Sequence, residues 1–190
     1  MNDITTVWKK LNPWMAANAP ELEQSLQQGA NSQEILELEQ HLGVTLPEDY
    51  KLFLGLCNGQ ADDALAEFYN GELLSIANIK FQWDAWKNLL ETNTFSGISS
   101  QPDKGIRNDW WNLKWIPFTH DGGGNHFCLD LAPANGGHVG QVITMWHDSS
   151  EREFVASNFT AWLEDILNGV ETGAIVFDAQ DYNALIDNDS

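Results

Sequence analysis

The chain has 190 residues, of which 43% are hydrophobic and 21 are aromatic (nine Trp, nine Phe and three Tyr), a composition that excludes a disordered protein. Asp and Glu number 28 against nine Lys and Arg; the resulting net charge of −19 excludes direct nucleic-acid binding, which needs a positive surface. No apolar run approaches the ~20 residues of a membrane span, and no secretory signal pattern is present, so we expect no membrane insertion.

The acidic residues are concentrated in two blocks. Residues 31–79 and 151–190 each hold nine acids and one base, whereas residues 80–150 hold seven acids and five bases. Such acidity either serves solubility alone or forms a surface for a basic protein partner. Cys57 and Cys128 show no metal-binding or redox spacing, so we expect two buried free thiols and a cytoplasmic protein.

The first third of the chain predicts short helices that end at Pro or Gly. Asn31 and Glu34 have the spacing of a capping box, in which each side chain binds the other residue's backbone N–H. The expected helical segments are 4–11 before Pro13, 20–26 before Gly29, 32–42 before Gly43 and 47–57 before Asn58.

The remaining two thirds predict one long helix, a series of strands and a final helix. Asn70 and Gly71 indicate a hairpin turn between strands at 67–69 and 73–74. Apolar residues from 79 to 90 have helical spacing, and residues 94–109 have the composition of a loop. Further strands are expected at 115–118, 126–131, 141–146, 154–155 and 175–177, with a helix over 157–169.

This order of elements predicts an α+β fold, with N-terminal helices followed by a mostly antiparallel β meander that a C-terminal helix closes. Pro117 indicates an edge strand or a bulge, because proline cannot donate to a ladder. We expect a single domain over residues 1–178, including a helical N-terminal extension over 1–30. Residues 179–190 are expected to form a flexible acidic tail.

Potential metal ligands are concentrated between residues 120 and 148, but they lack the spacing of a known metal motif. They are His120, Asp121, His126, Asp130, His138, His147 and Asp148. We therefore expect no metal and no cofactor, and we interpret the carboxylates and amides beside glycines as groups that order turns. The alternative from the enzyme class is a small metal-dependent hydrolase that uses His120, His126, Asp130 and His147.

Trp110 and Trp111 are the candidate partner-binding residues. Neighbouring residues of a strand face opposite sides, so one of these two side chains should be partly exposed. Tryptophan is also enriched among the residues that dominate binding energy in protein interfaces.

A series of individually weak motifs over residues 31–168 resembles, in composition and order, the SUKH superfamily with its Smi/Knr-type domain. The residues that carry the resemblance are Pro47, Asp49, Gly59, Trp115, Pro117, Asp121, Gly124, Asn125, Asp130, Pro133, Gly140, Gln141, His147 and Asp148. The resemblance implies a single SUKH-like α+β domain without a catalytic site, in which these shared residues fix the fold rather than the partner.

The resemblance implies two kinds of function. Bacterial members are commonly immunity proteins that bind and neutralise polymorphic toxins, many of them nucleases, whereas fungal members regulate cell-wall assembly through protein contacts. Because the chain lacks the long disordered flanks of the fungal proteins, our main hypothesis is an immunity protein whose partner is a toxin domain with a basic surface. The alternative is a regulator of cell-wall assembly or signalling that acts through protein contacts.

Overall fold

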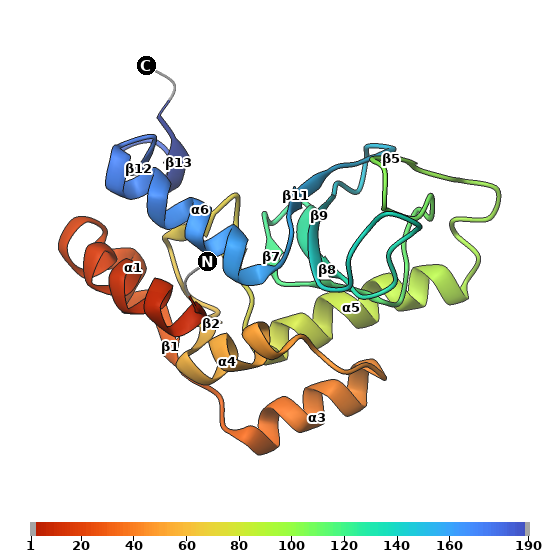
Figure 1. Cartoon of the computed structure of the whole chain (residues 1–190), viewed down its shortest axis with the longest axis horizontal. Coiled ribbons are helices and arrows are strands. Elements are labelled where there is room, and N and C mark those ends of the chain that lie inside the picture. The colour runs from red at the N-terminus through yellow and green to blue at the C-terminus, as the bar shows by residue number, and fades with distance from the viewer. Residues whose placement is uncertain (1–2, 189–190) are drawn as a thin grey trace.

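A computed structural model of the chain describes residues 3–188, in which most helices precede the larger sheet and two short strands follow the last helix (Figure 1). The helices are α1 (Ile4–Asn18), α2 (Pro20–Ser25), α3 (Ser32–Leu42), α4 (Glu48–Leu56), α5 (Ile76–Glu91) and α6 (Phe159–Thr172). The predicted α+β class is confirmed. None of the helices in the described part of the chain is long and apolar enough to cross a membrane.

The strands form one larger sheet and several small pairings. Their bounds are β1 (Leu26–Gln28), β2 (Cys57–Gln60), β3 (Glu67–Tyr69), β4 (Glu72–Leu73), β5 (Gln101–Pro102), β6 (Trp115–Pro117), β7 (Thr119–His120), β8 (His126–Asp130), β9 (Gln141–Met145), β10 (Glu151–Arg152), β11 (Phe154–Ala156), β12 (Ile175–Asp178) and β13 (Ala184–Asp187). The larger sheet is antiparallel in the order β11-β9-β8-β6, so Pro117 lies on an edge strand as predicted.

Every residue of β8 and β9 is buried, including the polar side chains on either face of β8. The reason is that the sheet is covered by other elements: α5 contacts β6, and α6 contacts β9 and β11. Helix α6 then runs away from the sheet towards the β12–β13 hairpin (Figure 1). The polar residues of β8, including His126 and Asp130, therefore find their hydrogen-bond partners inside the protein.

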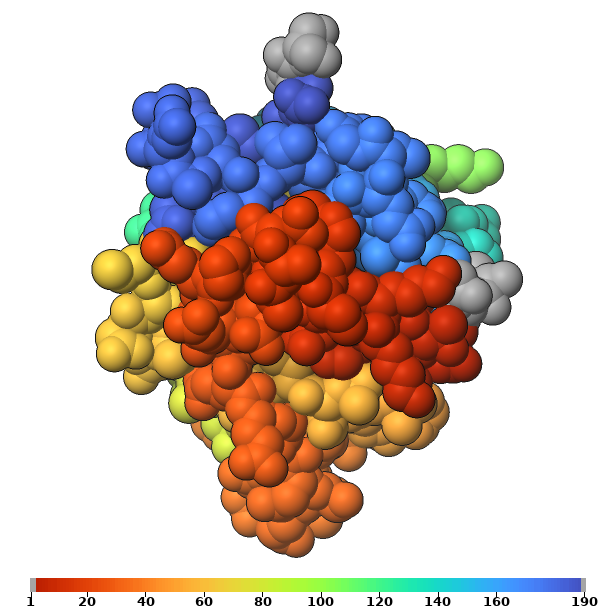
Figure 2. Space-filling model, turned by 90° about the vertical axis from the view of Figure 1, so that its left-hand side faces the viewer, coloured from red at the N-terminus to blue at the C-terminus, as the bar shows by residue number. Residues whose placement is uncertain are grey.

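Helix α1 continues through Pro13 to Asn18, whereas the sequence predicted an end before the proline. The missing backbone hydrogen bond is outweighed by burial, because one face of α1 packs into the common core. The buried residues of that face are Ile4, Val7, Trp8, Leu11 and Met15. Figure 2 shows α1 lying between α6 on one side and the segment that contains α3 on the other.

Asn70 and Gly71 form the expected turn with positive φ angles of 53° and 120°, but the strands on either side of it do not pair with each other. Strand β3 pairs with β13 in parallel, and β4 pairs with β7 antiparallel. The predicted pairing of β3 with β4 is therefore wrong, because each of these strands pairs with a strand that is distant in sequence.

Residues 184–187 form β13, whereas the sequence predicted a flexible tail from residue 179 onwards. The strand is held by pairing with β12 and β3 and by the burial of Ala184 and Leu185. Residues 189–190 of the expected tail lie outside the described residues. The preceding helix α6 continues past Gly169, where the sequence predicted its end, to Thr172 and is capped by Gly173, which has a φ of 81°.

The first of the motifs joins the N-termini of two helices. Asp49 in the first turn of α4 accepts hydrogen bonds through Oδ2 from the backbone N–H and the hydroxyl of Thr160, at 3.0 and 2.9 Å. Its Oδ1 accepts from the Tyr50 N–H, and the Tyr50 ring packs on Phe159 at the start of α6. A carboxylate at this point binds free N–H groups at both helix ends and is favoured by both helix dipoles.

Two glycines of the motifs allow close approaches of the backbone. Gly59 has a φ of 68°, and a Cβ there would collide with the backbone of Leu74. Gly140 has a φ of 88°, and a Cβ there would lie 3.1 Å from the Cγ of Pro47. Pro47 and Gly140 thus bring the start of α4 against the loop before β9.

Substitution of Asp49 by alanine should lower the free energy of unfolding by about 2 kcal/mol. The hydrogen bonds to a charged group are lost, and the two Thr160 donors are left without an acceptor at a part-buried position. Urea unfolding measures the change. Glu48→Gln is the matched control: its side chain is 81% exposed and ion-pairs with Lys51, so the effect should stay below about 0.5 kcal/mol. An Asp49→Ala protein as stable as the wild type would contradict this role.

Candidate functional site

The motif residues at one end of the larger sheet join two turns by hydrogen bonds. Asp121 accepts the backbone N–H groups of Gly123 and Asn125 at 2.8 and 2.9 Å, and it accepts from the Asn125 side-chain amide at 2.6 Å. Asn125 Oδ1 in turn accepts from the backbone N–H of His147 at 2.9 Å. The turn before β8 is thereby fixed to the turn after β9.

The charge of Asp121 is stabilised within this network. Burial by itself would raise the pKa of this carboxyl, but the hydrogen bonds from Asn125 and Gly123 outweigh burial and hold the pKa below its ordinary value. Gly124 lies against the His147 ring. The side chains of Asp121 and Asn125 thus order backbone, as their positions beside glycines predicted.

Asp130 and Gln141 order the loop at the other end of β8. Asp130 is fully buried, and its two oxygens accept from the Ala132 N–H and the Gln141 amide. Gln141 also accepts from the backbone N–H of His138. Burial raises the pKa of Asp130, although these hydrogen bonds act in the opposite direction. The loop that contains Pro133 is closed by these contacts.

The histidines proposed for a hydrolase do not form a metal site. His126 is buried between Trp86 Nε1 and the Thr119 carbonyl, and its ring stacks on His120 at 5.1 Å. Asp130 lies at the opposite end of β8, and His147 belongs to the turn network. No group of three or more His, Cys, Asp or Glu residues within residues 3–188 could hold a metal ion. The hydrolase alternative is therefore unsupported.

The structure separates the two candidate partner-binding tryptophans. Trp111 is 2% exposed and packs against Trp86 and Trp115, with ring centroids 5.3 and 6.2 Å away. It belongs to the core, so its proposed role as a contact residue is not supported. Trp110 is half-buried beneath the guanidinium of Arg152, which lies 5.0 Å from the ring centroid. The expected difference in exposure is present, although neither residue lies in a strand.

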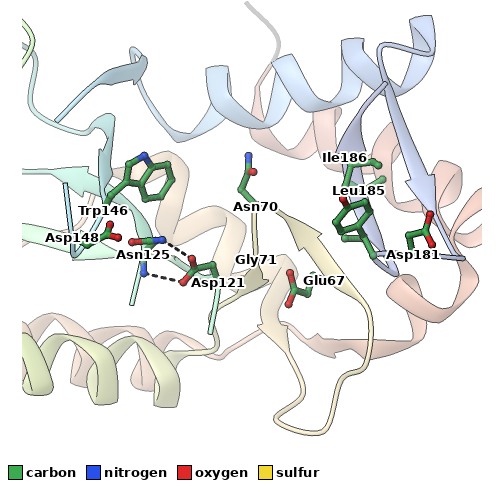
Figure 3. Close-up of a pocket in the computed structure, with 12 residues that line it drawn as sticks. Glu67, Asn70, Gly71, Asp121, Asn125, Trp146, Asp148, Asp181, Leu185 and Ile186 are labelled. Atoms are coloured by element: carbon green, nitrogen blue, oxygen red, sulfur yellow. Dashed lines mark hydrogen bonds between the residues drawn. The ribbon is translucent and has the colours of Figure 1, made fainter. Parts of the chain in front are cut away.

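A pocket of about 600 Å³ opens beside the turn network. Figure 3 shows Trp146, Asp148, Asn125 and Asp121 on one side, and Leu185, Ile186 and Asp181 on the other. Glu67, Asn70 and Gly71 lie between the two sides. We call this space the acidic pocket, because four of the residues that line it are carboxylates: Glu67, Asp121, Asp148 and Asp181.

Sequence reasoning singled out Asp121, Asn125 and Asp148 but missed the other carboxylates and Trp146. Glu67 and Asp181 reach the pocket only because β13 pairs with β3, which no local pattern indicates. Burial raises the pKa of Glu67, and the negative charges of Asp121 and Glu72 raise it further. The pocket therefore concentrates negative charge and favours a cation over an anion.

The family can be identified by comparison with known proteins. A model of the SMI1 / KNR4 family (SUKH-1) matches residues 29–165, which include all the motifs described above. The chain belongs to this family. The resemblance seen in the sequence is thus confirmed.

Several curated relatives of this SUKH-1 chain have names that describe regulation. It is 27% identical to a glucan synthesis regulatory protein of Neurospora crassa, over 96% of this chain and 41% of the relative. It is 23% identical to a cell wall assembly regulator of Saccharomyces cerevisiae, over 96% and 44% of the two chains. A cell wall biosynthesis and cell cycle regulator of Schizosaccharomyces pombe is 24% identical, over 94% and 38%.

These relatives contradict our main hypothesis of a bacterial toxin-immunity protein and favour the alternative, a cell-wall regulator. The hypothesis rested on the absence of long flanking segments. The chain spans less than half the length of these relatives, and the similarity lies within that shared part. The extent of the sequence therefore cannot serve to distinguish the two branches.

Proposed function

We propose that the chain is a non-catalytic regulator of cell-wall assembly that acts through contacts with other proteins. The observation that carries the proposal is its similarity, over 94–96% of its length, to three proteins named as regulators of glucan synthesis or of the cell wall. Support also comes from the motif side chains, since Asp49, Asp121, Asp130 and Gln141 hold backbone groups. Side chains that bind backbone groups in this way have a structural role, which fits a protein that acts through contacts.

The partner in this proposal is a protein with a basic surface. The net charge of −19 favours association with positively charged proteins and accelerates their encounter at low salt. Cys57 and Cys128 are free and buried, which supports a cytoplasmic location.

Deletion of the gene in its own organism should weaken the cell wall, because assembly would lose a regulator. The measurement is growth on increasing concentrations of a dye that binds wall polysaccharide, together with the glucan content of the isolated wall. A plasmid copy of the wild-type gene should restore both values, and an empty plasmid is the control. Unchanged dye tolerance and glucan content in the deletion strain would overturn the proposed function.

A further inference from the structure

A second pocket adjoins the acidic pocket, and Trp146 lines both. We call it the apolar pocket; its volume is about 560 Å³, and its lining residues come from β9, β11, α6 and β12 among other segments. Tyr69 lines the apolar pocket, and the next residue, Asn70, lines the acidic one. The two pockets therefore lie next to each other with Trp146 between them, and we call them together the groove.

The apolar pocket combines one exposed aromatic side chain with buried apolar residues. Phe154 lies on β11, an edge strand of the larger sheet, and is 46% exposed. Phe127 packs on Trp146 with ring centroids 5.6 Å apart, and the buried Ile166 and Ile175 are among the other apolar residues of the lining. A concave apolar surface beside polar groups is the usual form of a binding site for a side chain.

The charged residues of the groove all have the same sign. Asp103, Glu153 and Asp165 line the apolar pocket and four carboxylates line the acidic pocket, whereas none of the described lining residues is Lys, Arg or His. Burial raises the pKa of Asp165, and the negative charge of Glu164 raises it further. The pKa of Glu67 is raised by the same two causes, burial and neighbouring negative charges. A cation bound in the groove would relieve this repulsion, and Trp146 offers a ring face for it.

We propose that this groove binds an extended segment of the partner protein in which Lys or Arg residues flank a hydrophobic residue. The hydrophobic side chain enters the apolar pocket beside Phe154, and a neighbouring cation enters the acidic pocket beside Trp146. Charge complementarity favours this occupant over an acidic or purely apolar segment. The inference rests on the proposed function, because it names the surface through which the regulator contacts its partner.

The test uses a fluorescein-labelled peptide of sequence GSKRLFRKSG and fluorescence anisotropy on the full chain. Reversal of two groove charges by Asp148→Lys together with Asp165→Lys should raise the Kd of the peptide at least about tenfold, because each cation loses a carboxylate. Glu37→Lys with Glu91→Lys is the matched control: it reverses two exposed charges on α3 and α5 and should change the Kd by less than about twofold.

The hydrophobic contact is tested in the same way. Phe154→Ser should weaken binding at least about fivefold, whereas Phe81→Ser, at a position 69% exposed on α5, should leave the Kd unchanged. A peptide with glutamine in place of every Lys and Arg should bind far more weakly. Any one of three results would overturn the groove assignment. Both charge-reversal pairs could weaken binding equally, the glutamine peptide could bind as tightly as the original, or no saturable binding could be found.

The two proposals can fail separately. Absence of peptide binding together with a wall defect in the deletion strain would overturn the groove and leave the proposed function standing. Groove-dependent peptide binding together with a normal wall in the deletion strain would overturn the function and leave the groove as a peptide-binding site.

Discussion

Replacement of Arg152 by methionine is expected to lower the free energy of unfolding by about 3 kcal/mol or more, because the part-buried carbonyl groups around the guanidinium lose their donor. Arg152 is fully buried. It donates to the backbone carbonyls of Trp110, Trp146, Ser149 and Glu151. Lysine should not restore the stability, since one ammonium cannot reach the acceptors of both Nη1 and Nη2. Urea unfolding of both variants gives the measurement.

The matched control for Arg152 is Arg107, an exposed arginine whose Nε donates to the Ala132 carbonyl. Arg107→Met should cost less than about 1 kcal/mol, because water can replace the lost donor. If Arg152→Met cost no more than Arg107→Met, the buried guanidinium would not hold these segments together. Arg152→Lys with wild-type stability would contradict the requirement for a planar group.

Acidification from pH 6.5 to 4 is expected to destabilise the protein through His126 by roughly 3 kcal/mol. Burial lowers the pKa of His126 from 6.5 to about 4. The neutral ring uses both nitrogens, since Nε2 accepts from Trp86 and Nδ1 donates to the Thr119 carbonyl. Protonation of Nε2 would abolish the hydrogen bond from Trp86 and place a charge in the core.

The sign of the effect follows from proton binding. Between pH 6.5 and 4 the unfolded chain binds a proton at His126 and the folded chain does not, so the free energy of unfolding falls as the pH falls. Other groups also titrate in this range, and His126→Gln removes only this contribution while it keeps a donor and an acceptor. The difference in stability between wild type and variant should therefore change with pH. Two parallel curves from pH 7 to 4 would contradict the assignment.

Local sequence signals predicted those elements whose stabilising contacts are also local. The capping box at Asn31 and Glu34 is present, with all its hydrogen bonds within four residues. Pro13 was misleading, because the burial of α1 against distant elements outweighs one missing hydrogen bond. The turn at Asn70 was also predicted, but the pairing of β3 with β13 depends on residues more than 100 positions away.

The candidate groove could not be predicted from the sequence either, because it too depends on contacts between distant segments. Glu67, Asp121, Asp148 and Asp181 come from four separate segments, and only the tertiary fold brings them to one pocket. The motifs indicated the turn that holds Asp121 but not the space beside it. The overall acidity could be read without the fold, and it is the reason why we propose a basic partner. A motif shared across a family thus predicted the scaffold, whereas the binding surface depends on the three-dimensional arrangement.

The measurement that most directly tests regulation through the groove is the growth of the deletion strain on wall-binding dye, with different plasmid copies of the gene. We expect the wild-type gene and the Glu37→Lys/Glu91→Lys control to restore growth. We expect no restoration by Asp148→Lys/Asp165→Lys, although immunoblots should show that this protein accumulates to the wild-type level. Full restoration by the groove variant would contradict a regulator that acts through this surface.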